Sequence, residues 1–336
     1  NTAVGSLSLD ANTTANDNTA LGHGVLGDNT TGSNNTAVGQ GTLGSNITGS
    51  QNTSVGALAL DANTTGGQNT ALGEGALGAN TTASNNTAVG QEALTTNTTG
   101  AENTAVGKNA LYSNTTASYN TALGYRALEQ TTTGAENTAL GNRCLDANTT
   151  GSNNTAVGQA ALGNATTASH NTAVGDDALT ANTTGIKNTA VGSGALDANT
   201  TASSNTAIGY GALSTTTTKS DQTAIGYKAL YAANDSSDYN TALGFQALMA
   251  LTSGTRNIAI GWEAGVNLTT ANRCTIIGQN AGQGTLTGDD NVIIGREAGY
   301  DITSGGSNTS LGNYSLQNTT TGNANVAIGM EALQAN

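Results

Sequence analysis

The stretch "NTAVGQEALTTNTTGAENTAVGKNALYSNTTASYNTALG", residues 86–124, decides the fold, because one seventeen-residue phrase begins in it three times. The phrase recurs through all 336 residues in twenty copies, the last of them cut short. The copies begin at Asn1, Asn18, Asn35, Asn52, Asn69, Asn86, Asn103, Asn120, Asn137, Asn154, Asn171, Asn188, Asn205, Gln222, Asn240, Asn257, Cys274, Asn291, Asn308 and Asn325. Such a short, fixed period indicates a repeat architecture in which each copy is one structural unit.

The repeat predicts a single continuous repeat domain over residues 1–336. Every step is seventeen residues except the one from Gln222 to Asn240, which is eighteen. One residue is therefore inserted within 222–239, and the polar run "AANDSSDY" is the expected loop. The copies within 257–324 diverge most from the others.

Numbering the positions of each copy as columns 1 to 17 gives the consensus N-T-A-V-G-x-x-A-L-x-x-N-T-T-G-S-N. Column 5 is glycine in every copy, including Gly5, Gly90, Gly107, Gly124 and Gly329. A position that never carries a side chain indicates a positive φ or another backbone packed against it. We expect these glycines to be structural and to lie on one line.

The remaining columns separate into candidate core and candidate turns. Column 4 is always Val, Leu or Ile, column 9 is Leu except at Gly265, Gly282 and Gly299, and columns 3 and 8 are nearly always small. These four columns are the predicted buried positions. Columns 12 to 17 hold Asn, Thr, Gly and Ser, which are typical of turns.

The pattern predicts an all-β parallel β-solenoid of about twenty coils. A short β-branched segment closed by glycine favours one strand at the start of each copy, and a second short strand is expected in columns 7 to 10. Each column then stacks ~4.8 Å from its counterpart in the next coil. Asn and Thr are expected to hydrogen-bond to their own kind in these ladders, which also accounts for the many Asn-Thr-Thr glycosylation-like triplets.

Composition favours a thin solenoid over a compact globule. The chain has no proline, 46 glycines and 3% aromatic residues, whereas a globular domain of this length carries a large aliphatic and aromatic core. Because each coil offers few large apolar side chains, we expect the small-residue face to pack against other copies. The chain is therefore expected to be an oligomer.

Three segments, "NIAIGWEAG" at Asn257, "NVIIGREAG" at Asn291 and "NVAIGMEAL" at Asn325, resemble the head repeats of YadA-like trimeric autotransporter adhesins and similar repeats in trimeric phage tail fibres. The longer "NTAVGxxALxxNTTG" copies resemble repeats of tail-fibre-like proteins. The resemblance implies a left-handed β-roll, a homotrimer and a role in attachment at a surface. The repeat is longer than the YadA-like one, and residues 1–336 include no anchor, coiled-coil stalk or chaperone-like tail.

Charge and hydropathy narrow the range of expected binding partners. The net charge is −13, and the first 107 residues hold seven acidic residues without a single Lys or Arg. Nucleic acid and anionic membranes are poor partners for such a surface. No apolar run approaches eighteen residues and no signal-peptide pattern is present, so no membrane insertion is expected. The ends carry no polar cap, and head-to-tail stacking into a filament is one expected consequence.

The sequence supplies no catalytic or metal-binding constellation, and no cofactor is expected. His23 and His170 lie too far apart in the repeat to share a metal, and the Asp pairs at Asp176 and Asp289 lack calcium-loop spacing. Cys144 and Cys274 lie eight coils apart, which excludes an intrachain disulfide, so both are predicted to be free structural thiols.

One local feature stands out in column 6. It holds Tyr210, Tyr227, Phe245 and Trp262 in four consecutive copies, whereas residues 1–111 contain no aromatic residue. Stacked coils would place these rings in one line, flanked in column 7 by Lys228, Gln246 and Glu263. The line is a candidate site for a sugar chain or another apolar ligand; alternatively the rings stiffen the ladder or fill a contact between chains.

Three classes of function follow. The first is a structural or adhesive extracellular fibre segment without catalysis, an adhesin head or stalk or a filament subunit, with a phage tail-fibre shaft as its alternative. The second is an ice-binding or carbohydrate-binding solenoid, although ice binding needs a flat Thr-x-Thr array that the columns do not supply. The third, a β-helix enzyme, is disfavoured because the acids are scattered. The expected location is extracellular, on a cell surface or in a virion fibre, with a surface glycan or host surface protein as a possible partner.

Overall fold

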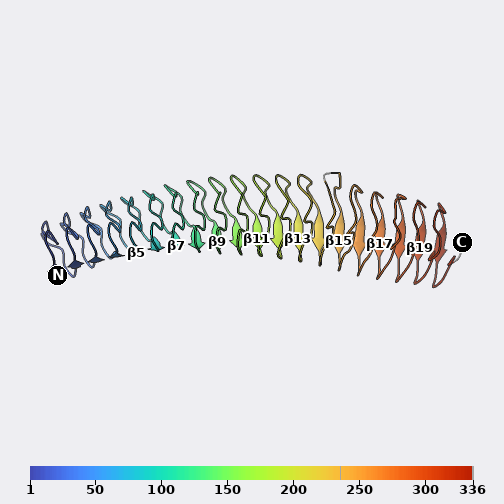
Figure 1. Cartoon of the computed structure of the whole chain (residues 1–336), viewed down its shortest axis with the longest axis horizontal. Coiled ribbons are helices and arrows are strands. Elements are labelled where there is room, and N and C mark those ends of the chain that lie inside the picture. Colours follow the sequence, from blue (N-terminus) through green and yellow to red (C-terminus); the bar gives the residue numbers. More distant parts are fainter. Residues whose placement is uncertain (235, 335–336) are drawn as a thin grey trace. The chain divides into compact units, whose positions relative to one another are not determined.

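The computed structural model describes residues 1–234 and 236–334, and the described chain is all-β. It divides into two compact units, Asn1–Ser169 and His170–Asn336. Each unit is a parallel β-solenoid in which successive seventeen-residue coils stack upon one another, each with a three-residue strand at the same place (Figure 1). The predicted fold class is thereby confirmed, while its handedness and its assembly into trimers remain predictions.

Ten strands belong to the first unit: β1 Thr2–Val4, β2 Thr19–Leu21, β3 Thr36–Val38, β4 Thr53–Val55, β5 Thr70–Leu72, β6 Thr87–Val89, β7 Thr104–Val106, β8 Thr121–Leu123, β9 Thr138–Leu140 and β10 Thr155–Val157. Ten belong to the second: β11 Thr172–Val174, β12 Thr189–Val191, β13 Thr206–Ile208, β14 Thr223–Ile225, β15 Thr241–Leu243, β16 Ile258–Ile260, β17 Thr275–Ile277, β18 Val292–Ile294, β19 Thr309–Leu311 and β20 Val326–Ile328.

The strands pair in parallel with each residue opposite its counterpart in the next copy, for example Thr53 opposite Thr70 and Val55 opposite Leu72. The register survives the predicted insertion, because Thr223 pairs with Thr241, eighteen residues later. The inserted position falls in a run that contains Asp235, which lies outside the described residues. The extra residue is therefore absorbed between the strands and does not shift them.

The predicted second strand in columns 7 to 10 is wrong. Columns 7 and 9 both lie in the left-handed region, as in Glu92 (φ 58°) and Leu94 (φ 52°), and column 17 does so too. Two such residues separated by one position cannot form an extended strand. The backbone nevertheless stays hydrogen-bonded to neighbouring coils, since Leu60 N–H donates to the Ala76 carbonyl at 3.0 Å. Each coil is thus bonded to its neighbours through its turns as well as its strand.

The burial prediction is confirmed for columns 3, 8 and 9 and wrong for column 4. In the strand that contains Ala88, the alanine is buried, while Val89 and its equivalents in other coils are half-buried or exposed. Successive side chains of a strand point to opposite faces. Column 3 therefore points into the coil and column 4 points out, so a Val, Leu or Ile side chain covers the outer face. The small residues of columns 3 and 8 are buried inside the coil, so the prediction that a small-residue face packs against other copies is wrong.

Asparagine supplies polar groups to the core, although column 12 was predicted to lie in a turn. The column 1 and column 12 asparagines, such as Asn52 and Asn63, are fully buried. Asn63 Nδ2 donates to Asn46 Oδ1 at 2.8 Å, which is the predicted ladder of like residues. Threonine behaves differently, because Thr64 Oγ1 donates to the backbone carbonyl of Thr81 at 3.0 Å and not to another hydroxyl. The asparagine of a typical Asn-Thr-Thr triplet, such as Asn63, is therefore inaccessible to glycosylation in the folded chain.

The column 5 glycines meet both conditions predicted for them, except that Gly329, in the last coil, has the positive φ but no backbone packed against it. Gly90 has a φ of 132°, and a Cβ built on it would lie 2.5 Å from the carbonyl oxygen of Gly107 in the next coil. Real Cβ atoms do not approach so closely, and the same relation recurs along each unit. Glycine is therefore required for two independent reasons: its backbone conformation and the close approach of the adjacent coil.

The divergent copies use a rearranged core. Where column 9 changes from Leu to Gly265, Gly282 and Gly299, column 3 gains Ile276 and Ile293. A Cβ on Gly265 would lie 3.1 Å from Ile276 Cδ1, so the isoleucine occupies space that leucine fills in other coils. Glycine also adopts the left-handed conformation of column 9 without the cost that leucine pays there.

Candidate functional site

The column 6 aromatic residues form a ladder in the second unit. The ring centroids of Tyr210 and Tyr227 lie 5.5 Å apart with planes 12° from parallel, and those of Tyr227 and Phe245 lie 5.2 Å apart at 10°. Trp262 continues the line at 6.0 Å from Phe245 but is tilted by 53°. All four side chains are exposed, at 41 to 56% of their surface. In-register stacking of coils therefore brings together the four residues singled out in the sequence, with spacings favourable for aromatic pairs.

The column 7 residues beside the ladder make different contacts. Lys228 Nζ lies 5.6 Å from the ring centroid of Tyr227 and 5.1 Å from that of Tyr231, within the range of cation–π attraction. Glu263 accepts a hydrogen bond of 3.1 Å from Gln283 Nε2. The cation therefore lies against the aromatic surface, while the carboxylate is engaged with a neighbouring amide.

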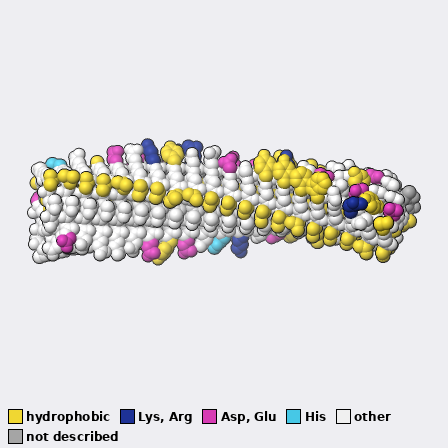
Figure 2. All heavy atoms as spheres, turned by 90° about the horizontal axis from the view of Figure 1, so that it is seen from below, with side chains coloured by type: hydrophobic (Ala, Val, Ile, Leu, Met, Phe, Trp, Pro, Cys, Tyr) yellow, Lys and Arg dark blue, Asp and Glu magenta, His cyan; other side chains and the backbone are white. Residues whose placement is uncertain are grey.

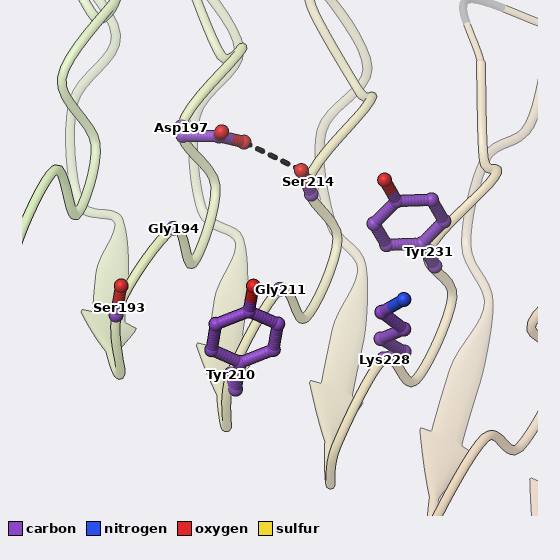
Figure 3. A pocket seen from close by; sticks show the side chains of 8 residues that line it. All are labelled: Ser193, Gly194, Asp197, Tyr210, Gly211, Ser214, Lys228 and Tyr231. Atoms are coloured by element: carbon purple, nitrogen blue, oxygen red, sulfur yellow. Dashed lines mark hydrogen bonds between the residues drawn. The ribbon is translucent and has the colours of Figure 1, made fainter.

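A pocket of about 190 Å³ opens at the N-terminal end of the ladder, over the three coils that begin with β12, β13 and β14. Its lining comes from columns 6, 7 and 10 of these coils: Ser193, Gly194, Asp197, Tyr210, Gly211, Ser214, Lys228 and Tyr231 (Figure 3). Only Tyr210 and Lys228 were among the residues predicted from sequence to form or flank the site. The other six were missed.

Two consecutive glycines in column 7 create the floor of this pocket. Gly194 and Gly211 have φ values of 63° and 60°. A Cβ on Gly211 would lie 3.6 Å from Lys228 Cγ and from Tyr231 ring carbons, so a side chain there would fill the hollow. The signal for this pocket was present in the sequence as paired column 7 glycines next to aromatic residues in columns 6 and 10.

The walls combine ring faces with polar groups. Ser214 Oγ donates to Asp197 Oδ1 at 2.7 Å across neighbouring coils, drawn as the dashed line in Figure 3. In the same view the side chains lie in front of the ribbon, and the rings of Tyr210 and Tyr231 are seen broadside. The pocket therefore offers an acceptor, several hydroxyls, one ammonium group and two aromatic surfaces within one small volume.

A second hollow, of about 340 Å³, lies in the first unit and is lined by Tyr125, Asn142, Arg143, Gln159 and Ala160. Tyr125 occupies column 6, as Tyr210 does, and is exposed. It has no second aromatic residue beside it in the lining and no paired glycines beneath it. This hollow provides an internal comparison for the pocket of the second unit.

The other candidate residues do not form a reactive site. His23 and His170 are exposed and lie in different units. Asp176 is exposed, whereas Asp289 and Asp290 are paired with Arg273 at 3.3 and 2.6 Å. The hydrogen bond from Arg273 lowers the pKa of Asp290. Within residues 1–234 and 236–334, no group of three or more His, Cys, Asp or Glu side chains is placed to hold a metal ion.

Both cysteines are free and buried. Cys144 replaces the usual column 8 alanine, and its Sγ donates to the Gly158 carbonyl at 2.6 Å. Burial raises the pKa of this thiol to about 11, and burial likewise raises the pKa of Cys274. Neither thiol has the low pKa of a reactive cysteine.

Comparison with known proteins adds no family: no protein-family model matches the chain, and no curated protein shows significant similarity to it. The described residues include no helix that is long and apolar enough to cross a membrane.

Proposed function

We propose that the chain is a structural and adhesive segment of an extracellular fibre, without a catalytic role, in which three copies associate side by side. The observation that carries this proposal is the exposed apolar column 4. Its residues form one row on the outer face of each unit, visible as apolar side chains running along each unit in Figure 2. They pair in register from Val4 to Val157 in the first unit and from Val174 to Ile328 in the second.

The row is too apolar and too regular to be ordinary surface. Leu72 is 47% exposed, Leu123 38% and Leu140 45%, and every position between them is Val. Neighbouring strands lie ~4.8 Å apart, so these side chains form a contiguous strip and not scattered single residues. A contiguous exposed apolar patch marks an interaction surface. Because the repeat puts the same residue types at every coil, a second copy of the chain is the partner with a matching periodicity.

We propose three copies because, when three chains surround one axis, the apolar strip of each chain faces the strips of the two others. The resemblance to trimeric adhesin and tail-fibre repeats supports this number and a location at a cell surface or in a virion fibre. An extended multi-chain segment with few reactive groups suits attachment and spacing.

The test is the mass of the full chain in solution. Light scattering during size-exclusion chromatography is expected to give three times the chain mass of 33.0 kDa at micromolar concentration. Replacing the paired residues Leu123 and Leu140 by lysine should dissociate the assembly, because like charges then face one another across the strip. Replacing Tyr119, which is exposed in column 17, by lysine is the matched control and should leave the mass unchanged. A monomer or dimer for the unaltered chain, or a trimer that survives both lysines, would overturn the proposal.

The ice-binding alternative keeps one supporting observation. Column 2 threonines also point outward and pair in register, as Thr87 does with Thr104, so a threonine row lies beside the apolar row. It is a single row, whereas an ice-binding face needs the regular Thr-x-Thr array. Thermal hysteresis measured on the unaltered chain decides between them: freezing-point depression by a monomeric chain would replace the fibre proposal.

A further inference from the structure

We propose that the pocket above the paired glycines Gly194 and Gly211 binds one ring of a neutral glycan. The inference deepens the adhesive part of the proposed function by naming the ligand class. All of its residues belong to the second unit, and they come from three successive coils. A flexible loop is not involved, since each lining position is fixed by the hydrogen bonds between coils, for example Gly211 N–H to the Ser193 carbonyl at 3.1 Å.

The aromatic residues supply the stacking surfaces. Tyr210 is 56% exposed and Tyr231 37% exposed, and both rings lie broadside in the view of the pocket (Figure 3). The apolar C–H face of a pyranose ring packs on an aromatic face, while its hydroxyls remain at the ring edge. Tyrosine suits this task because it joins an apolar ring to a hydroxyl that reaches a polar partner. Tyr227 and Phe245 extend the surface beyond the pocket, so a longer chain has further rings to contact.

The polar side chains of the pocket are suited to bind the hydroxyl groups of a sugar. Asp197 accepts hydrogen bonds, Lys228 donates them, and Ser193 and the tyrosine hydroxyls do both. Ser214 already donates its hydroxyl hydrogen to Asp197, so it acts as an acceptor. A sugar hydroxyl is itself donor and acceptor, so it can pair with either kind of group. An anionic sugar would approach the Asp197 carboxylate in a chain of net charge −13, and a cationic sugar would approach Lys228. The mixture of one carboxylate and one ammonium therefore favours an uncharged, hydroxyl-rich ligand.

The size of the pocket fits a single ring of a longer chain. Pockets for drug-sized ligands enclose about 300–1,000 Å³, and this hollow encloses about 190 Å³. It is open to solvent, so a chain can continue past it. Gly211 is the decisive residue for access, since any side chain there would contact Lys228 and Tyr231.

Two variants separate binding from folding. Tyr210→Ala removes one stacking surface. Gly211→Asn fills the floor without changing the backbone, because asparagine already occupies column 7 in the left-handed conformation at Asn109 and Asn280. Tyr125→Ala, in the same column of the first unit, and Gly24→Asn, at a column 7 glycine with open space around it, are the matched controls.

The experiment is a titration of the full chain with neutral hexasaccharides of glucose, mannose and galactose, and with polygalacturonate as the anionic comparison. Trp262 and tyrosine fluorescence and calorimetry report binding. At least one neutral oligosaccharide should bind, with affinity reduced about tenfold or more by Tyr210→Ala and by Gly211→Asn and unchanged in both controls. Binding to none of the neutral sugars, preference for the anionic polymer, or equal binding by all variants would overturn the inference. Light scattering on the same samples reports chain association separately, so failure of glycan binding is distinguishable from failure of the fibre proposal.

Discussion

The side-chain oxygen of Asn35 accepts a hydrogen bond of 2.9 Å from the backbone N–H of Asn52, the equivalent residue one coil later. Asn52 repeats the arrangement toward Asn69 at 3.0 Å and also donates through Nδ2 to the Gly66 carbonyl at 2.9 Å. All three asparagines are buried. Asn52 therefore joins its own coil to the coils on both sides, through its backbone N–H and its side-chain amide. Such bonds stabilise the stack of a chain that has few large apolar residues.

Asn52→Ala is expected to destabilise the first unit by about 1–3 kcal/mol, because the buried N–H of Asn69 loses its acceptor. The Gly66 carbonyl keeps a second donor in Asn63, so only one group is orphaned. The midpoint of urea unfolding measures the effect. Thr53→Ala, at the adjacent outward-facing position, should shift the midpoint little. Equal shifts for the two variants would show that the asparagine ladder contributes no specific stability.

Gly90→Ala is expected to cost at least about 3 kcal/mol, from a strained φ together with a clash against the next coil. Its Cβ would lie 2.5 Å from the Gly107 carbonyl oxygen. Gly24 has a φ of 64° and nothing within 4 Å of its ideal Cβ, so Gly24→Asn should change stability by less than about 0.5 kcal/mol. Thermal unfolding followed by circular dichroism compares the two. A tolerated alanine at residue 90 would refute the dual requirement for glycine in column 5.

Ile276→Ala is expected to cost about 2–5 kcal/mol through the cavity that it leaves. Gly265→Leu alone should also destabilise, because its Cβ would meet Leu248 and Ile276 at 3.0 and 3.1 Å. Together the two changes restore the usual alanine and leucine of columns 3 and 9, so the pair should be less destabilising than the sum of the single variants. A double-mutant cycle of unfolding free energies measures this coupling. Strict additivity would mean that the two columns do not share one core volume.

The Cys144 thiol gives the chain a specific sensitivity to alkali. Its pKa rises from 9.0 to about 11 on burial, so the folded state favours the neutral thiol. The stability that it contributes is complete below pH 9.0 and is lost as pH rises toward about 11. Cys144→Ala should therefore lose less stability than the unaltered chain across that interval, measured by urea unfolding at successive pH values. Parallel pH profiles for the two proteins would contradict the prediction.

Much of the fold could be predicted by comparing the repeat copies within this one chain. The seventeen-residue period, the universal Gly of column 5 and the short β-branched segment predicted parallel coils, and the strand register agrees column by column. The aromatic residues of column 6 were predicted to align, and they do so at 5.2 to 6.0 Å between neighbouring ring centroids. Periodicity alone determines these relations, because any in-register stack places like residues beside like.

Only the tertiary structure decided whether the side chains of each column point into the coil or outward, and where the surface between columns forms a pocket. Hydropathy assigned Val89 and its equivalents to the core, yet the single-residue alternation of the strand turns them outward and leaves Ala88 inside. The composition of columns 12 to 17 also assigned Asn63 to a turn, whereas this side chain is buried. Composition does not show that its amide is hydrogen-bonded to the Gly66 carbonyl and to the equivalent asparagines on either side. The pocket over Gly194 and Gly211 depends on which side chains are absent between columns 6 and 10, and that space exists only once three coils are stacked. The sequence by itself determined the repeating unit and the stacking of each residue on its counterpart in the next coil. The path of the backbone through left-handed turns decided which side chains pack inside the coil and which stay exposed and can contact a partner.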